Sequence, residues 1–216
     1  MTKNSTPSSR ITAISPQKKN PGRFSVFIEN NYAFSLSASL SFTLHTGQCL
    51  SEEEIDALKK AGETELAVAR GLFYLKFRPR SISEITGYLE KKQFTQPAIE
   101  AAIKKLKDYG YLDDAAFAQF WVESRKQHRP RGLFALRYEL MQKGIDKRII
   151  ADALSQYDEF EQAWRAVSAK LSAWRKLTDF ELKKKTYTFL KQKGFAFETC
   201  EDVFNKAIEE RSHENK

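Results

Sequence analysis

A segment of about 50 residues occurs three times along this chain. Its clearest mark is a leucine followed three residues later by a lysine in the pattern Leu-x-x-Lys, then by glutamine or glycine and a large apolar residue. The leucines are Leu89, Leu140 and Leu190, separated by 51 and then 50 residues. Repeats of this length are typical of helical arrays, in which stacked units share a core that one unit cannot build alone. We therefore expect the three leucines to be equivalent and buried.

Each repeat carries apolar side chains at helical spacing, for example Ile99, Ala102, Ile103 and Leu106. Short turns separate the helices within the units, at residues 78–81, 129–132 and 177–179. The sequence therefore predicts a mainly α fold. It consists of three tandem three-helix repeats of helix-turn-helix character that form an elongated curved array, preceded by a small N-terminal β-hairpin or sheet.

The N-terminal region has the alternating β-branched and aromatic residues of strands at 10–15, 23–29 and 32–36, with Asn30-Asn31 as a turn. A sheet this small should pack on a helix. Ser51 and Glu54 form a capping-box pattern that predicts the start of a helix. We expect that helix to end near Ala61-Gly62, because glycine is common just after a helix.

These patterns suggest a division of the chain into six segments. A disordered tail comes first and a C-terminal tail last, with a β-rich region that includes capping helices and the three three-helix repeats between them. The expected boundaries are 1–9, 10–62, 63–112, 113–157, 158–210 and 211–216.

No apolar run reaches the roughly 20 residues of a membrane helix, and the polar N-terminus does not resemble a secretory signal. Cys49 and Cys200 are isolated, which is typical of a reducing compartment. We therefore expect a soluble cytoplasmic protein.

Sequence motifs of catalysis are absent: the chain has no glycine-rich phosphate loop, no GxSxG and no HExxH. His45, His128 and His213 lack the spacing of metal ligands. The carboxylate pair Asp113-Asp114 is better explained as a helix cap, since it comes directly before an apolar helical stripe. We expect no catalytic residue, no metal and no cofactor.

The charge balance favours an anionic partner, since 36 lysines and arginines outnumber 28 acidic residues for a net charge of +8. Arginine dominates a window without acids between Glu123 and Glu139, and an Arg-Pro-Arg turn occurs at both 78–80 and 129–131. A run of charge is commonly just a solvated face, but the planar guanidinium suits phosphate. The candidate binding residues are Arg78, Arg80, Arg125, Lys126, Arg129, Arg131, Arg137 and Lys143.

Several spaced motifs together resemble the RecX family. They are the segment GYLDDAAFA at 110–118, the Arg-Pro-Arg-Gly turn at 129–132, Lys-Gly-Ile at 143–145 and the apolar stripe at 149–154. The third repeat departs from this pattern, because Asp179-Phe180-Glu181 stands where the other two have Arg-Pro-Arg.

The resemblance implies a regulator built of tandem three-helix repeats, without cofactor or catalytic site. Such a protein binds the RecA–single-stranded DNA filament and inhibits its recombinase, ATPase and coprotease activities, which modulates homologous recombination, DNA repair and the SOS response. We expect a monomer that contacts single-stranded DNA directly or through the filament, and no membrane.

Two other functions fit the same residues. A helix-turn-helix transcriptional regulator would prefer particular duplex sequences, and a helical scaffold that binds only protein would show no dependence of affinity on salt. Sequence alone does not distinguish these hypotheses, nor an inhibitor from an activator.

Overall fold

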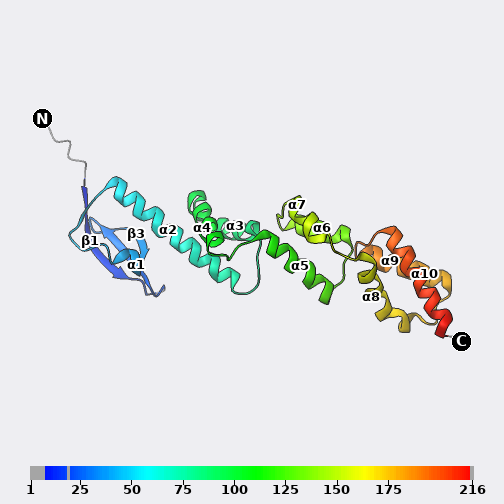
Figure 1. The fold of residues 1–216 in the computed structure, drawn as a ribbon. Helices are drawn as coiled ribbons and strands as arrows, with labels where there is room; N and C mark the ends of the chain where they lie inside the picture. Colours follow the sequence, from blue (N-terminus) through cyan, green and yellow to red (C-terminus); the bar gives the residue numbers. More distant parts are fainter. Residues whose placement is uncertain (1–7, 19, 215–216) are drawn as a thin grey trace. The chain divides into compact units, whose positions relative to one another are not determined.

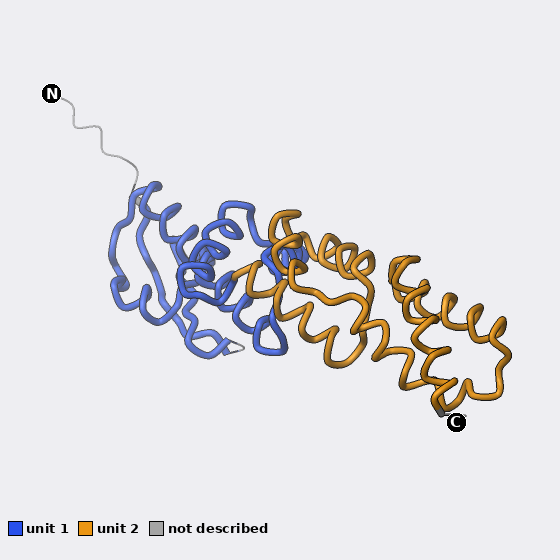
Figure 2. Tube along the Cα trace, turned by 45° about the vertical axis from the view of Figure 1, so that its right-hand side comes forward, with its two compact units in different colours: residues 1–112 blue, residues 113–216 orange. Residues whose placement is uncertain are grey.

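The computed structural model describes residues 8–18 and 20–214. The chain forms two compact units, Met1–Leu112 and Asp113–Lys216 (Figure 2). The first unit holds a small sheet and the helices as far as residue 108, and the second holds the helices from residue 114 onward (Figure 1).

An antiparallel sheet of four strands opens the first unit, in the order β3-β2-β1-β4. The three predicted strands are confirmed, and a fourth short strand was not predicted. The strands are β1 Ser8–Pro16, β2 Arg23–Ile28, β3 Asn31–Ser37 and β4 Cys49–Ser51, with the one-turn helix α1 Ala38–Ser41 after β3. The tight turn lies one residue earlier than expected, at Glu29 and Asn30, whose φ angles are 48° and 66°.

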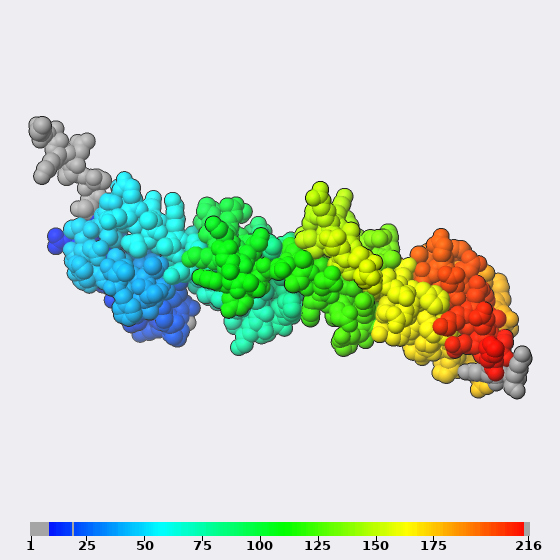
Figure 3. All heavy atoms as spheres, viewed as in Figure 1, coloured from blue at the N-terminus to red at the C-terminus, as the bar shows by residue number. Residues whose placement is uncertain are grey.

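Helix α2, Glu52–Leu75, covers this sheet and then continues into the first three-helix repeat. The capping box of Ser51 and Glu54 is confirmed. The expected helix end near Ala61-Gly62 is wrong, because α2 passes through Gly62 without a break. A Cβ at Gly62 would overlap the Ser35 carbonyl oxygen and lie 2.8 Å from Leu36 Cδ2. This glycine therefore allows β3 and α2 to approach closely, and the blue and cyan atoms of the sheet and α2 form a continuous body in Figure 3.

Three three-helix repeats follow, as the periodicity predicts. The C-terminal half of α2 joins α3 and α4 in one apolar core, α5 to α7 build a second, and α8 to α10 build a third. Leu89, Leu140 and Leu190 are fully buried, one in each core, which confirms the expected burial. The helices are α3 Ile82–Lys91, α4 Gln96–Asp108, α5 Asp114–His128, α6 Leu133–Gln142, α7 Lys147–Leu154, α8 Glu159–Leu171, η1 Ser172–Trp174, α9 Asp179–Gln192 and α10 Phe197–Glu214.

Both expected tails need correction. Ser8 and Ser9 belong to β1, while the rest of the proposed disordered tail lies outside the described residues. The C-terminal segment from 211 is helical as far as Glu214, where α10 ends. Asp113, by contrast, caps α5 as expected, since its carboxylate accepts hydrogen bonds from the amides of Ala115 and Ala116.

Two glycines allow a close contact between the second and third repeats. The N–H of Gly132, the residue before α6, donates to the carbonyl of Lys193 at 3.0 Å. A Cβ at Gly132 would overlap the backbone of Gly194, and one at Gly194 would lie 2.5 Å from Ala135 Cβ. The turn before α6 therefore lies directly against the turn before α10.

A carboxylate from the third repeat also caps α6. Gly132 has no side chain with which to cap the helix, and the amide of Leu133 donates to Oε1 of Glu159 at 2.6 Å instead. Thr199 Oγ1 donates to Oε2 of the same carboxylate at 3.0 Å. A negative charge at a helix N-terminus is favourable, so this bond further stabilises the contact between the repeats.

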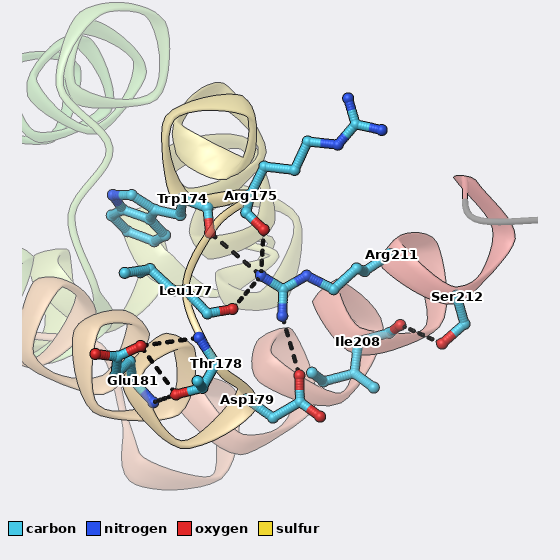
Figure 4. Close-up of polar contacts among 9 residues, drawn as sticks. All are labelled: Trp174, Arg175, Leu177, Thr178, Asp179, Glu181, Ile208, Arg211 and Ser212. Carbon is cyan, nitrogen blue, oxygen red and sulfur yellow. Dashed lines mark hydrogen bonds and ion pairs between the residues drawn. The ribbon is translucent and has the colours of Figure 1, made fainter.

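Arg211 of α10 holds the turn between η1 and α9 (Figure 4). Its Nη2 donates to the carbonyls of Trp174, Arg175 and Leu177 at 3.2, 3.0 and 2.7 Å, and Nη1 pairs with Asp179 Oδ1 at 3.0 Å. One guanidinium thus binds three backbone carbonyls of this turn and the carboxylate of Asp179.

The contact at Gly132 can be tested with Gly132→Ala. Because the added methyl group meets backbone that cannot rotate away, we expect the free energy of unfolding to fall by about 1–3 kcal/mol. Gly87→Ala is the matched control: nothing lies within 4 Å of its Cβ position inside α3, so the free energy should rise by about 0.5–1 kcal/mol. Urea unfolding followed by circular dichroism measures both. A Gly132→Ala variant as stable as the wild type would contradict the close contact.

The contribution of the Arg211 hydrogen bonds can be tested with Arg211→Gln. Loss of charge-assisted bonds to several carbonyls should lower the free energy of unfolding by about 1.5–3 kcal/mol. Arg175→Gln removes the same charge from an exposed side chain that points away from the turn in Figure 4, and should have almost no effect. All three tryptophans lie in the second unit, so their fluorescence during urea unfolding reports on it directly. Equal losses in both variants would show that Arg211 contributes only its charge.

Candidate anion-binding surface

The eight predicted binding residues fall into two groups. Arg78 and Arg80 lie in the turn between α2 and α3 of the first unit. The other six lie in the second unit, on α5, on the turn before α6, and on α6 and its C-terminal end. These are Arg125, Lys126, Arg129, Arg131, Arg137 and Lys143.

Arg78 forms a bidentate ion pair within the first unit. Its Nη2 and Nη1 donate to the two carboxylate oxygens of Glu84 at 2.7 and 3.1 Å. The hydrogen bond to Glu84 raises the pKa of Arg78. Glu84 also completes the capping box with Ser81 at the start of α3. Both Nη groups of this arginine therefore already have partners inside the protein.

Arg80 packs on an aromatic stack. Its guanidinium carbon lies 3.9 Å from the centre of the Tyr74 ring, which in turn stacks on Tyr88 with centroids 4.2 Å apart. Its Nε is buried and has no hydrogen-bond partner among the described residues. The stack therefore fixes the plane of this guanidinium without neutralising its charge.

Glu139 of α6 is the centre of the group in the second unit. Its Oε2 accepts from Trp121 Nε1 and from Arg125 Nε, both at 2.8 Å, and its Oε1 lies 3.6 Å from Arg131 Nε. It is the one acidic residue between Glu123 and Asp146. A single carboxylate thus orders side chains from α5 and from the turn before α6.

The ring of Trp121 holds two cations. The guanidinium carbon of Arg125 lies 4.6 Å from the ring centre, and Lys143 Nζ lies 5.1 Å from it. With Arg131 and the carboxylate of Glu139, these groups carry a net charge of +2 within one small cluster. Sequence reasoning missed both Trp121 and Glu139. The isolation of Glu139 among basic residues was the available signal.

The geometry leaves donors for a ligand. Arg125 and Arg131 approach Glu139 through Nε, and no hydrogen bond occupies their Nη groups within the described part of the chain. The Nη groups carry four of the five N–H donors of a guanidinium and form the fork that grips carboxylate or phosphate. Glu139 therefore positions these two arginines and leaves their Nη groups available to a ligand.

The turn that carries Arg129 and Arg131 is held by Tyr157. The phenol donates to the carbonyl of Arg131 at 2.5 Å. Burial raises the pKa of Tyr157 to about 12, so the phenol keeps the proton that it donates at neutral pH. Lys126 Nζ lies 5.7 Å from the centre of the same ring and 3.8 Å from Glu123.

The third repeat adds a cation that sequence reasoning missed. The pKa of Lys193 is lowered, first by burial and then by repulsion from Arg131, Lys170 and Arg129. Lys193 therefore lies in the field of the arginine turn. It is the lysine of the Leu-x-x-Lys pattern, equivalent to Lys143, and each of the two lies about 5 Å from an aromatic ring. The repeat itself was the signal that could have found it.

Arg129 and Arg137 are exposed, and neither has an ion-pair partner within residues 8–18 and 20–214. Arg129, with the Glu139 cluster and Lys193, makes a surface rich in N–H donors, to which we refer as the Glu139 surface. Arg137 stands two residues before Glu139 on α6 and therefore lies on another side of that helix. The Glu139 surface is suited to bind phosphate or carboxylate groups.

Among the described residues no group of three or more His, Cys, Asp or Glu side chains could hold a metal ion. No helix in that part of the chain is long and apolar enough to cross a bilayer.

Four family models match the chain in order. The RecX N-terminal domain matches residues 9–49, and the first, second and third RecX three-helix domains match residues 67–114, 113–154 and 157–204. The matched segments contain β1 from Ser9, β2 and β3, and most of each helical core described above.

Two whole RecX proteins and one crystal structure are also similar to this chain over most of its length. Regulatory protein RecX of Bacillus subtilis is 36% identical over 210 residues, which cover 95% of this chain and 78% of that protein. Regulatory protein RecX of Lactobacillus gasseri is 34% identical over 213 residues, with the same coverage. A crystal structure of regulatory protein RecX, 28% identical, matches 91% of this chain and 99% of its own with a TM-score of 0.69. The chain therefore belongs to the RecX family of regulatory proteins.

Proposed function

We propose that this protein binds the RecA–single-stranded DNA filament and inhibits its recombinase, ATPase and coprotease activities. Through that inhibition it modulates homologous recombination, DNA repair and the SOS response. The observation that carries the proposal is the match to all four RecX domains in order. We propose further that it acts in the cytoplasm as a monomer, without a catalytic site or cofactor.

The Glu139 surface is the proposed contact with the anionic filament. Its Nη forks suit the phosphates of the DNA strand or carboxylates of the recombinase. Contact with phosphates would release counterions and make binding salt-dependent, while the net charge of +8 would speed the encounter. The turn with Arg78 and Arg80 is a second proposed contact of lesser weight, because Glu84 already occupies both Nη groups of Arg78.

The proposed contact of the second unit can be tested with the double variant Arg129→Gln/Arg137→Gln, which removes one exposed arginine from the Glu139 surface and one from the outward face of α6. Both side chains are exposed, so their loss should leave the fold intact. We expect the concentration that inhibits the DNA-dependent ATPase of the cognate RecA to rise roughly tenfold. The slope of log affinity against log salt should fall by up to about 0.7 for each phosphate that the variant no longer neutralises.

Lys60→Gln/Lys104→Gln is the matched control, since it removes two exposed charges from the first unit. It should inhibit nearly as well as the wild type. Equal effects of both double variants would show that net charge alone matters and would remove the site assignment. No inhibition by the wild type, together with strong preference for one duplex sequence, would favour a transcriptional regulator instead.

Lys193 provides a separate test of the surface. A bound anion would raise the lowered pKa of this amine, because it relieves repulsion from Arg131 and Arg129. Free Lys193 loses its proton at lower pH than the bound form, so affinity should fall as pH rises through the lowered pKa. Lys193→Gln should weaken filament binding and flatten this pH dependence. Lys191→Gln, an exposed neighbour on α9, should do neither, and an equal effect of both would contradict a role for Lys193.

A further inference from the structure

The outward face of α6 carries an apolar stripe that the core does not use. Phe134, Tyr138 and Met141 are 76%, 60% and 52% exposed, and Arg137 lies exposed between them. The opposite face of the helix fills the core with Leu136 and Leu140, both fully buried. The four exposed residues stand at helical spacings of three, four and seven, so they share one face.

The fold of the repeat does not require this stripe. At the positions equivalent to Phe134, Tyr138 and Met141, the other two repeats have small or charged residues, while the buried leucine equivalent to Leu140 is kept in both. These residues are Ser83, Gly87 and Glu90 on α3, and Lys184, Thr188 and Lys191 on α9. The same three-helix architecture thus forms with a polar outer face, and the aromatic face of α6 needs another explanation.

The chemistry of the stripe is that of a protein interface. Phe, Tyr, Met and Arg are enriched at the centres of such interfaces, whereas Lys, Glu and Asp are depleted there. The one acidic residue of α6, Glu139, is turned away into its bonds with Trp121 and Arg125. A stripe of anchors at these helical spacings is the pattern by which a helix lies in a groove of its partner.

The surrounding charge defines the partner. Arg137 is the exposed charge on this face of α6, and Glu139, the one carboxylate of the helix, is already paired with Arg125. A complementary groove would be apolar at its base and lined with carboxylates at its rim. Single-stranded DNA fits less well, because Met141 offers a base neither a ring to stack on nor a charge for its phosphate.

We propose that the outward face of α6 docks into an apolar, carboxylate-rimmed groove on a protein subunit of the filament. This inference rests on the proposed function and names which component of the filament this face contacts. Phe134, Tyr138 and Met141 are the anchors, and Arg137 pairs with the acidic rim.

The test is the triple variant Phe134→Gln/Tyr138→Gln/Met141→Gln, compared with wild type by co-sedimentation with RecA filaments formed on oligo(dT). We expect at least a tenfold loss of affinity, with an unchanged salt slope because no charge is removed. Phe42→Gln/Phe77→Gln/Phe180→Gln is the control, since these phenylalanines are similarly exposed on other elements. It should change affinity less than twofold. Circular dichroism and urea unfolding check that both triple variants are folded.

The remaining outcomes are decisive as well. Unchanged filament binding by a folded α6 variant would overturn the inference and leave the proposed function standing. An equal loss of binding to bare oligo(dT), measured by fluorescence anisotropy, would overturn it in favour of a base-stacking surface. A wild type that sediments as a dimer and an α6 variant that sediments as a monomer would show that a second copy covers this face. If the wild type does not bind filaments, the proposed function fails and the inference with it.

Discussion

The contact between the backbones of Gly132 and Gly194 is the constraint on which the second unit depends. Two turns from different repeats meet there with no room for a Cβ, and an amide-to-carbonyl bond joins them. Glu159 then caps α6 from the third repeat. Because the arginine turn comes directly before this contact, its position follows from backbone packing. The Glu139 surface is therefore built on rigid backbone and not on a mobile loop.

Electrostatics inside the Glu139 surface depends on one carboxylate. Several cations in a small volume repel one another, and at the edge of the cluster burial and then this repulsion lower the pKa of Lys193. Glu139 offsets part of this repulsion and draws Arg125 and Arg131 in through Nε. Two further cations, Lys143 and Lys126, lie over the aromatic rings of Trp121 and Tyr157. A surface that stays positive and is already ordered loses less entropy when an anion binds.

The three repeats show how one core supports different outer surfaces. Their leucines are equally buried, yet the Arg-Pro-Arg turn forms a bidentate pair at Arg78 and leaves the equivalent Arg129 exposed. The third repeat has Asp179 in place of that motif, and there Arg211 holds the turn from α10. In the same way, α6 has exposed Phe134, Tyr138 and Met141 where the equivalent positions of α3 and α9 are small or charged. Divergence at exposed positions costs the core little, so each repeat is free to carry a separate contact.

The sequence by itself determined the repeat, the helical class, the strands and the caps, because these follow from local periodicity and from hydrogen bonds between near neighbours. It also located the basic window around Arg125 and Arg131 through the absence of acids. It could not show that Gly62 lies inside a helix, because glycine occurs both just after helices and where two backbones pack closely. The tertiary structure shows that close packing is the reason here, because the Ser35 carbonyl lies where a Cβ of residue 62 would be. Tertiary structure alone gathered Trp121, Glu139 and Lys193 around the arginine turn. These residues come from separate helices, and their meeting depends on how the helices pack, which no short-range pattern records.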